Sequence, residues 1–306
     1  MKAVLKFFVC LIGIIIFGGI MNFAIKKTIL KDYKINKNKD LIVFGDSHAE
    51  SDFNGADINI QNLGYRTETP NFTLLKMKHL LSNVNDSEKT VIVVVSPHNI
   101  SKWHELRSFQ LDSSASRLSR FWNVIDNSLI YKDYLELPFR TQLTLHTKKL
   151  FGSPSVDGSF KFKSTFKGGF YKNKDTTVVT IEQAKKANEK HFGNIDFVLR
   201  NNKSEKLIEM YHDVFSFLKQ KNLRVIVIGS PLHSNYRKLL TKEQVFNYEL
   251  FLNEIEGNYS NVKVLNFSKL GIPNKYFLDT DHLNILGEVY FTDIVKDKIN
   301  SLFTGA

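Results

Sequence analysis

Cysteine is almost absent from this chain of 306 residues, in which Cys10 is the only one. A single cysteine excludes an intrachain disulfide, so the fold must be held together by its core. This argues against a small secreted scaffold stapled by disulfides and fits a cytosolic or bacterial periplasmic domain. The residues before Cys10, namely Phe7, Phe8 and Val9, do not resemble a lipoprotein cleavage site, so lipidation is not expected.

Internal repeats are also missing, and the positive charge is spread unevenly. The formal net charge is +11, but residues 1–40 hold eight Lys and two Asp, a net of +6, which leaves +5 for the other 266 residues. A basic chain can indicate a nucleic-acid partner. Here the excess lies beside an apolar segment, which favours a membrane surface or membrane topology instead. We therefore expect no nucleic-acid partner.

The apolar segment, residues 7–25, has 19 residues and no charged side chain. At 1.5 Å per residue it would extend about 28 Å as a helix, close to the thickness of the bilayer hydrocarbon. A secretory signal has an apolar core of about 7–15 residues followed by a small-residue cleavage site. No clear site follows here, so residues 1–25 are predicted to be an uncleaved single-span anchor. The polar residues 26–40 then form a linker.

Lysines stand on both sides of the segment, with more after it than before it. The positive-inside rule taken alone would place the large domain in the cytoplasm. That rule is strongest for short loops, and a large domain can be translocated against it. The family resemblance described below favours the periplasm or exterior, which is the orientation we predict.

Short apolar runs alternate with helical periodicity from residue 41 onward. Five runs predict buried strands, at 41–44, 58–63, 91–95, 225–228 and 262–265, and three stretches with helical spacing lie at 71–81, 207–218 and 284–302. Strands separated by helices imply crossover connections. The sequence therefore predicts a three-layer α/β/α domain over residues 41–303, with a mostly parallel five-stranded sheet. Residues from about 100 to 200 do not fit the alternation and are expected to be an insertion or cap over the carboxyl edge of the sheet.

In an open parallel sheet, reactive groups gather beyond the carboxyl ends of the strands. The first predicted strand is followed by Gly45, Asp46, Ser47 and His48. A Ser at such a turn can begin a helix and direct its own N–H toward a developing oxyanion. The alternative is an ordinary helix cap, because Asp and Ser both cap helices well.

A second polar group, from Asp279 to Asn284, precedes the last predicted helix. A nucleophilic Ser needs a base, and the base needs an orienting carboxylate. His282 and Asp279 are three residues apart and can meet within one loop, with Asp281 as the competing carboxylate or a helix cap. A metal site is an alternative for an Asp/His cluster. Only one His and no Cys stand in this loop, so neither a metal nor another cofactor is expected.

Two more strand ends carry polar or small residues. Gly64 follows the second strand and could expose its N–H to a ligand, although a plain turn glycine is the simpler interpretation. Ser96, Pro97, His98 and Asn99 follow the third strand. Asn99 could donate to an oxyanion, and His98 could contact substrate.

The order of these groups resembles the SGNH hydrolase superfamily, the GDSL-like esterases, over nearly all of residues 41–303. The resemblance implies that Ser47 is the nucleophile and first oxyanion donor, Gly64 the second donor, His282 the base and Asp279 its partner. The family's third motif is Gly-x-Asn-Asp, whereas this chain has residues 96–99 as Ser-Pro-His-Asn. Asn99 is taken as the third donor, and His48 and His98 as substrate contacts.

The stretch from Asp279 to Gly287 is similar to the membrane-anchored branch that includes alginate O-acetylation and lipoteichoic-acid D-alanylation proteins. That similarity implies a single-pass bacterial cytoplasmic-membrane protein that hydrolyses esters of, or transfers acyl groups to, a cell-envelope polysaccharide. A multi-spanning O-acyltransferase is an implied partner. A lipase or lysophospholipase, and a non-catalytic binding or assembly protein with the same fold, remain alternatives.

Overall fold

A computed structural model describes residues 35–57, 59–82, 84, 89–109, 178–193 and 201–304, with twelve further positions between 4 and 20. The chain divides into two compact units. One comprises Met1–Lys34 with Ser108–Thr165, and the other Ile35–Arg107 with Phe166–Ala306. The second unit contains the sheet and all of the strand-end residues singled out above.

A five-stranded sheet forms the centre of this second unit. Its strands are β1 (Leu41–Phe44), β2 (Ile60–Asn62), β3 (Thr90–Val95), β4 (Arg224–Gly229) and β5 (Val262–Asn266). They pair in the order β2-β1-β3-β4-β5, and every pairing is parallel. The prediction of an α/β fold with a five-stranded parallel sheet is confirmed, and each predicted strand overlaps an observed one.

The helices of the described residues alternate with the strands. They are α2 (Ser47–Asp52), α3 (Pro70–Leu80), η1 (Pro97–Ile100), α4 (Lys102–Phe109), α8 (Ile181–Phe192), α10 (Glu205–Gln220), α11 (Ser234–Arg237), α12 (Lys242–Asn258), η3 (Asn274–Tyr276) and α13 (Ile285–Thr304). The three stretches with helical spacing correspond to α3, α10 and α13.

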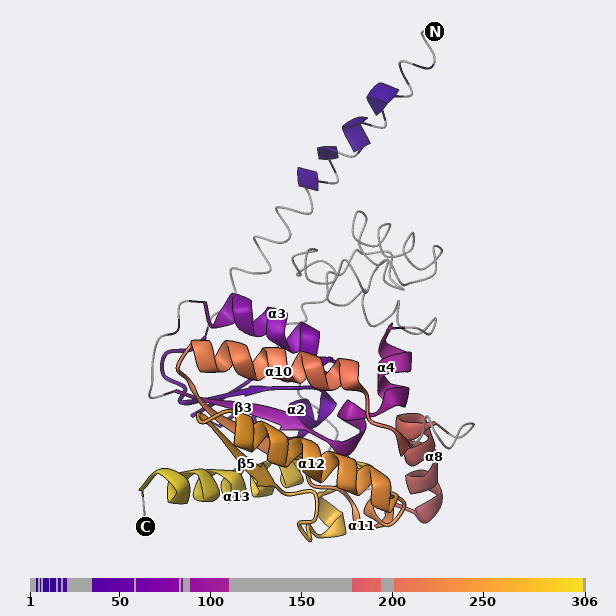
Figure 1. The fold of residues 1–306 in the computed structure, drawn as a ribbon, viewed down its shortest axis with the longest axis vertical. Helices are drawn as coiled ribbons and strands as arrows, with labels where there is room; N and C mark the ends of the chain where they lie inside the picture. Colours follow the sequence, from indigo (N-terminus) through magenta and orange to yellow (C-terminus); the bar gives the residue numbers. More distant parts are fainter. Residues whose placement is uncertain are drawn as a thin grey trace. The chain divides into compact units, whose positions relative to one another are not determined.

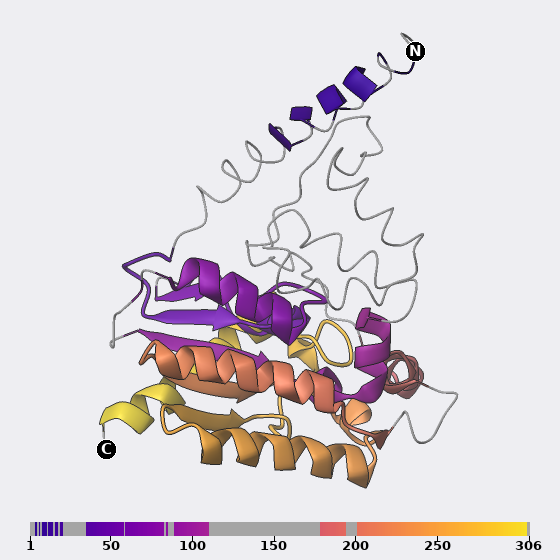
Figure 2. The same cartoon turned by 45° about the horizontal axis from the view of Figure 1, so that its top comes forward.

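Helices cover both faces of the sheet. Figures 1 and 2 show α3, α10 and α12 side by side on one face, with α13 on the other. Alternate strand residues divide between the faces, as the period of two in a strand requires. Val43, Ile92 and Ile226 join the core cluster that contains Phe53, just after α2, and Phe291 of α13. Burial on both faces explains why β3 is apolar along its whole length after Thr90.

Part of the predicted insertion belongs to the same unit as the sheet. Helix α8 begins with a capping box, in which Thr180 Oγ1 accepts from the Gln183 N–H and the Gln183 side chain accepts from the Thr180 N–H. Its buried Ala184 and Phe192 pack with Leu232 and Tyr236, the latter on α11. Residues 110–177 lie outside the described part of the chain, so the cap over the sheet edge stays a prediction.

The predicted anchor is only partly covered by the described residues. Among the positions that the structure describes, no helix has both the length and the apolar character needed to cross a bilayer. Residues 21–34, which hold the end of the predicted anchor and most of the linker, lie outside the description. The anchor therefore stays a prediction.

Candidate active site

The strand order places two polar loops side by side. The chain leaves β1 toward β2 on one side of the sheet and later returns to β3 on the other side of β1. Ligand sites of open α/β sheets form at such a reversal, beyond the carboxyl ends of the two strands. Residues 45–48 follow β1 and residues 96–99 follow β3, so both loops meet at this position.

Ser47 is held at the first position of α2 by its two neighbours. Gly45 has φ of 141°, and a Cβ at this position would lie 2.9 Å from the Val94 carbonyl oxygen. Only glycine tolerates this turn without strain. Asp46 then caps α2, because its Oδ1 accepts from the His48 N–H at 3.0 Å.

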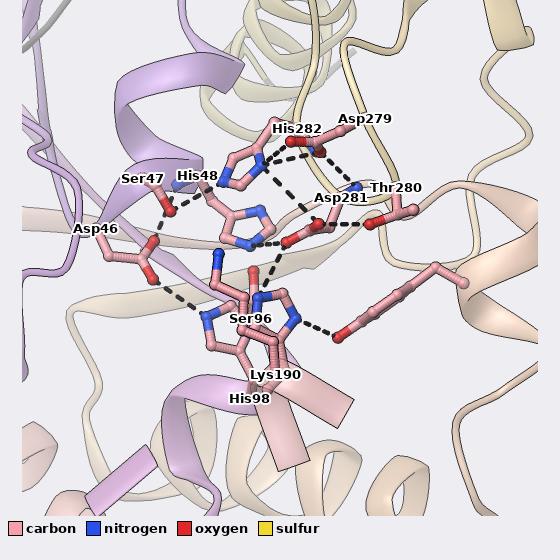
Figure 3. Close-up of polar contacts among 12 residues, drawn as sticks. Asp46, Ser47, His48, Ser96, His98, Lys190, Asp279, Thr280, Asp281 and His282 are labelled. Carbon is pink, nitrogen blue, oxygen red and sulfur yellow. Dashed lines mark hydrogen bonds and ion pairs between the residues drawn. The ribbon is translucent and has the colours of Figure 1, made fainter. Parts of the chain in front are cut away.

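Ser47, His282 and Asp279 form one continuous hydrogen-bonded line, which Figure 3 shows with Ser47 and Asp279 on opposite sides of the imidazole. Ser47 Oγ lies 2.9 Å from His282 Nε2. His282 Nδ1 lies 3.0 Å from both Asp279 oxygens. These separations are those of a nucleophile, a base and an orienting carboxylate.

Of the two candidate carboxylates, Asp279 holds the imidazole. Its Oδ1 also accepts from the Asp281 and His282 N–H groups at 3.1 and 2.9 Å, which fixes the loop around the carboxylate. Asp281 stands farther away, with its Oδ1 3.9 Å from His282 Nδ1. Asp281 does not cap α13 either, because Asn284 Oδ1 accepts from the N–H groups of Leu286 and Gly287.

The charge around His282 makes its imidazole a strong base. Burial by itself would lower the pKa of His282, but the negative charges of Asp281 and Asp279 outweigh burial and raise that pKa to about 10. The two carboxylates thus stabilise the protonated imidazole, which is the form that the ring has after it accepts a proton, and the ring must lose its proton before it can act as a base.

Gly64 has a structural task that the sequence analysis did not anticipate. Its N–H donates to Asn62 Oδ1 at 2.9 Å, so this donor is already engaged. A Cβ at Gly64 would lie 2.4 Å from Ala49 Cβ, so the residue is glycine to let α2 pack closely. We therefore do not retain Gly64 as an oxyanion donor. Of the donors assigned by sequence, this leaves the N–H of Ser47, at a helix start where intrahelical partners are lacking.

Asn99 also acts within the protein. Its Nδ2 donates to Asp46 Oδ2 at 2.6 Å, and its Oδ1 accepts from the Ser96 N–H at 2.6 Å. Asn99 thus links the loop after β3 to the residue that caps α2. We replace the prediction of Asn99 as an oxyanion donor by a positioning role, because its Nδ2 donates to Asp46 and also lies 3.4 Å from His98 Nε2.

His48 and His98 lie beside the triad but are buried, with 0% and 6% of their surface exposed. The His48 ring stacks against His282, with ring centres 4.9 Å apart. His98 Nε2 faces Asp46 Oδ2 at 3.4 Å. Burial by itself would raise the pKa of Asp46. The contact with His98 and the charge of His48 outweigh burial and hold that pKa well below its usual range. The prediction that His48 and His98 contact substrate is therefore not supported, because each ring is enclosed by the loops around it.

His191 was missed by sequence reasoning. It lies at the end of α8, more than 85 residues from the triad, Asp281, His48 and His98, and its ring stacks on His98 with centres 4.4 Å apart. Its Nδ1 lies 2.7 Å from the Tyr236 hydroxyl. No local pattern distinguishes it from a surface histidine in the last turn of a helix, so only the packing of α8 on α11 reveals it.

Potential metal ligands also gather here. Within the described residues, His48, Asp281 and His282 each offer a ligand atom within 4.8 Å of the others. Zinc, like other imidazole-binding ions, takes such donors.

Comparisons with known proteins add little to this geometry. One family model, which carries no functional description, matches residues 161–304. That span contains Asp279 and His282 but not Ser47, and it is less than half of the chain. No curated protein matches the chain. The argument for function therefore depends on the arrangement of the site.

Proposed function

We propose that this chain is a serine esterase or O-acyltransferase of the SGNH type, with Ser47 as nucleophile. The observation that carries the proposal is the line from Ser47 Oγ through His282 to Asp279, with separations of 2.9 and 3.0 Å. A helix cap would explain Ser47 alone, but it would not explain a buried imidazole aligned on its hydroxyl and held by a carboxylate. The sheet order, with Ser after β1 and Asp-x-x-His before the last helix, supports the SGNH assignment.

The reaction follows from the positions of these atoms. Ser47 Oγ attacks the ester carbonyl carbon while its proton moves to His282 Nε2, and the Ser47 N–H donates to the oxyanion. The tetrahedral adduct collapses, the leaving alcohol takes the proton from His282, and the acyl group stays on Ser47. Water or a sugar hydroxyl then attacks the acyl-enzyme and gives its proton to the same imidazole. Collapse of this second adduct breaks the bond to Ser47 Oγ, which takes the proton back from His282 as the product leaves. Asp279 orients the ring and takes no proton.

The acceptor and location are part of the same proposal. By its similarity to envelope-modifying enzymes, the chain would act on a cell-envelope polysaccharide beside a multi-spanning O-acyltransferase. The uncharged segment 7–25 supports a single-pass anchor in the cytoplasmic membrane with the domain outside. A reporter fused after Ala306 should be active only as an extracytoplasmic reporter. A cytoplasmic signal would remove envelope glycan as a substrate.

One observation favours a second candidate, a binding or assembly protein without catalysis. Two of the three oxyanion donors expected from sequence, Gly64 and Asn99, are engaged in hydrogen bonds within the protein. Removing a single oxyanion donor typically costs about 10²–10³ in kcat. A site that relies on the Ser47 N–H could therefore be slow or inactive.

Covalent labelling separates the two candidates. The full-length protein in detergent should react with a serine-directed fluorophosphonate and hydrolyse a small activated ester, and Ser47→Ala should abolish both. Ser234→Ala is a matched control, because Ser234 also begins a helix but is exposed. His282→Ala should cost nearly as much turnover as Ser47→Ala, and the double variant no more than either alone. Labelling that survives Ser47→Ala, or no labelling of the wild type, would leave the binding-protein candidate.

A further inference from the structure

Three buried side chains outside the triad point at one another. Asp281 Oδ2 lies 3.4 Å from His48 Nε2 and 3.7 Å from His191 Nε2. The side chains of His48, Asp281 and His191 are 0%, 4% and 10% exposed. They come from α2, from the loop before α13 and from the end of α8, so three separate elements bring them together.

These contacts are too long for hydrogen bonds. Protein N–H···O hydrogen bonds join atoms about 2.7–3.2 Å apart. Asp281 Oδ2 and both ring nitrogens of His48 are buried and make no hydrogen bond. Buried polar atoms are nearly always hydrogen-bonded, and exceptions call for a reason such as a bound ion. A plain ion pair between protonated His48 and Asp281 is the competing explanation, but it leaves His191 unexplained.

The two separations from Asp281 Oδ2 are close to those of atoms that share a metal ion. Zinc binds imidazole nitrogen and carboxylate oxygen at about 2.0–2.2 Å, and tetrahedral angles then place neighbouring ligand atoms about 3.3–3.6 Å apart. The 3.4 Å separation falls in this range, and the 3.7 Å separation exceeds it by about 0.1 Å. Among the described residues, the group whose ligand atoms all lie within 4.8 Å of one another is His48, Asp281 and His282, so an ion held at Asp281 Oδ2 would have to draw the His191 ring toward His48.

The groups behind two of the ligands hold them in the orientation that a metal requires. The Tyr236 hydroxyl lies 2.7 Å from His191 Nδ1, which leaves Nε2 directed at Asp281. Thr280 Oγ1 donates to Asp281 Oδ1 at 2.8 Å, which leaves Oδ2 for an ion. Histidine and carboxylate ligands of metals are usually oriented by hydrogen bonds of this kind.

We propose that His48 Nε2, His191 Nε2 and Asp281 Oδ2 bind one divalent transition-metal ion of the zinc class, adjacent to the triad. Two neutral imidazoles and one carboxylate suit ions that prefer nitrogen donors over Ca²⁺ or Mg²⁺. The His48 ring stacks against His282, so the ion would lie one ring away from the proposed base. The proposal does not depend on the esterase function, because it concerns residues and a readout separate from turnover.

Cobalt tests the proposal, because Co²⁺ reports its coordination through visible d–d bands. The full-length protein, stripped of metal, should bind one Co²⁺ per chain with the intense bands of a four- or five-coordinate site, and Zn²⁺ should displace it. His191→Ala and Asp281→Asn should abolish the bands. His212→Ala is the matched control, since His212 also pairs with a carboxylate, Glu254, at 3.1 Å but at the surface, and its bands should equal those of the wild type.

If His191→Ala fails to fold, a more conservative substitution still tests the proposal. Tyr236→Phe removes only the hydroxyl behind His191 and should weaken Zn²⁺ binding about 10–100-fold in competition with a chelator. Wild-type protein without saturable Co²⁺ bands would overturn the proposal, as would affinity unchanged by Tyr236→Phe in a folded protein. Bands lost in His282→Ala but kept in His191→Ala would also overturn it, because the ion would then lie on the triad.

Discussion

Two clusters of buried polar side chains lie close together in this fold, and they differ in how fully they are hydrogen-bonded. Under α3, Glu68 Oε1 accepts from Thr73 Oγ1 at 2.7 Å and Oε2 accepts from Lys76, which also donates to the Leu63 carbonyl at 2.6 Å. Beside the triad, His48 and Asp281 keep buried atoms without hydrogen bonds.

The difference separates scaffold from site. A fully satisfied buried network rigidifies the structure, whereas a partly satisfied one is costly unless something else uses it. The Glu68 cluster has a neighbour of the same kind, in which Glu50 of α2 accepts from the Arg66 N–H at 2.8 Å and from its guanidinium at 2.9 Å. Both clusters brace the loop after β2 against α2 and α3. The incomplete cluster lies where the proposed chemistry occurs.

The largest expected effect is on catalysis and comes from a change in the triad. Asp279→Asn should lower kcat by about 10²–10⁴, because an amide facing Nδ1 favours the wrong tautomer of His282. The amide oxygen can still accept from the loop N–H groups, and the side chain is 47% exposed, so stability should change little. Ester turnover and thermal unfolding of the same preparation check both parts. A kcat within tenfold of the wild type would mean that Asp279 does not orient the base.

On the scaffold side, Lys76→Met should cost about 3–5 kcal/mol of unfolding free energy, since it leaves Glu68 buried without its ion-pair partner. Denaturant unfolding at neutral pH measures the loss. Adding Glu68→Gln should recover much of it, because the uncompensated charge is then gone. Burial already raises the pKa of Glu68 to about 7, so a single variant as stable as the wild type would show that Glu68 takes up a proton when Lys76 is absent and that the ion pair does not stabilise the scaffold.

The smallest effect tests the residue that joins the two regions. Asn99→Ala should lower the free energy of unfolding by about 1–3 kcal/mol, because Asp46 Oδ2 loses its donor at 2.6 Å. Thermal unfolding and kinetics measured together distinguish this role from the one expected from sequence. A loss of more than a hundredfold in kcat with an unchanged melting temperature would return Asn99 to the oxyanion site.

Much of the fold, and the triad of Ser47, His282 and Asp279, could be predicted from local sequence patterns. The apolar runs of β1, β3 and β4 predict strands buried on both faces, and helices between strands imply parallel pairing. Ser47, Asp279 and His282 could be paired in advance because their chemistry requires them to meet. The sequence also favoured Asp279 over Asp281 as the partner of His282, since a residue three positions before His282 can reach its Nδ1 within one loop.

Tertiary structure alone decided the tasks of Gly64, Asn99, His48, His98 and His191. Each of these residues has a side chain or N–H that could serve a ligand, and nothing nearby in the sequence shows whether the protein itself uses it. Asn62 takes the N–H of Gly64, and Asp46 takes the amide of Asn99. His191 reaches the site only because α8 packs on α11. The periodicity of apolar residues determines secondary structure, whereas the partner of a polar group depends on which distant elements the core brings within hydrogen-bonding distance.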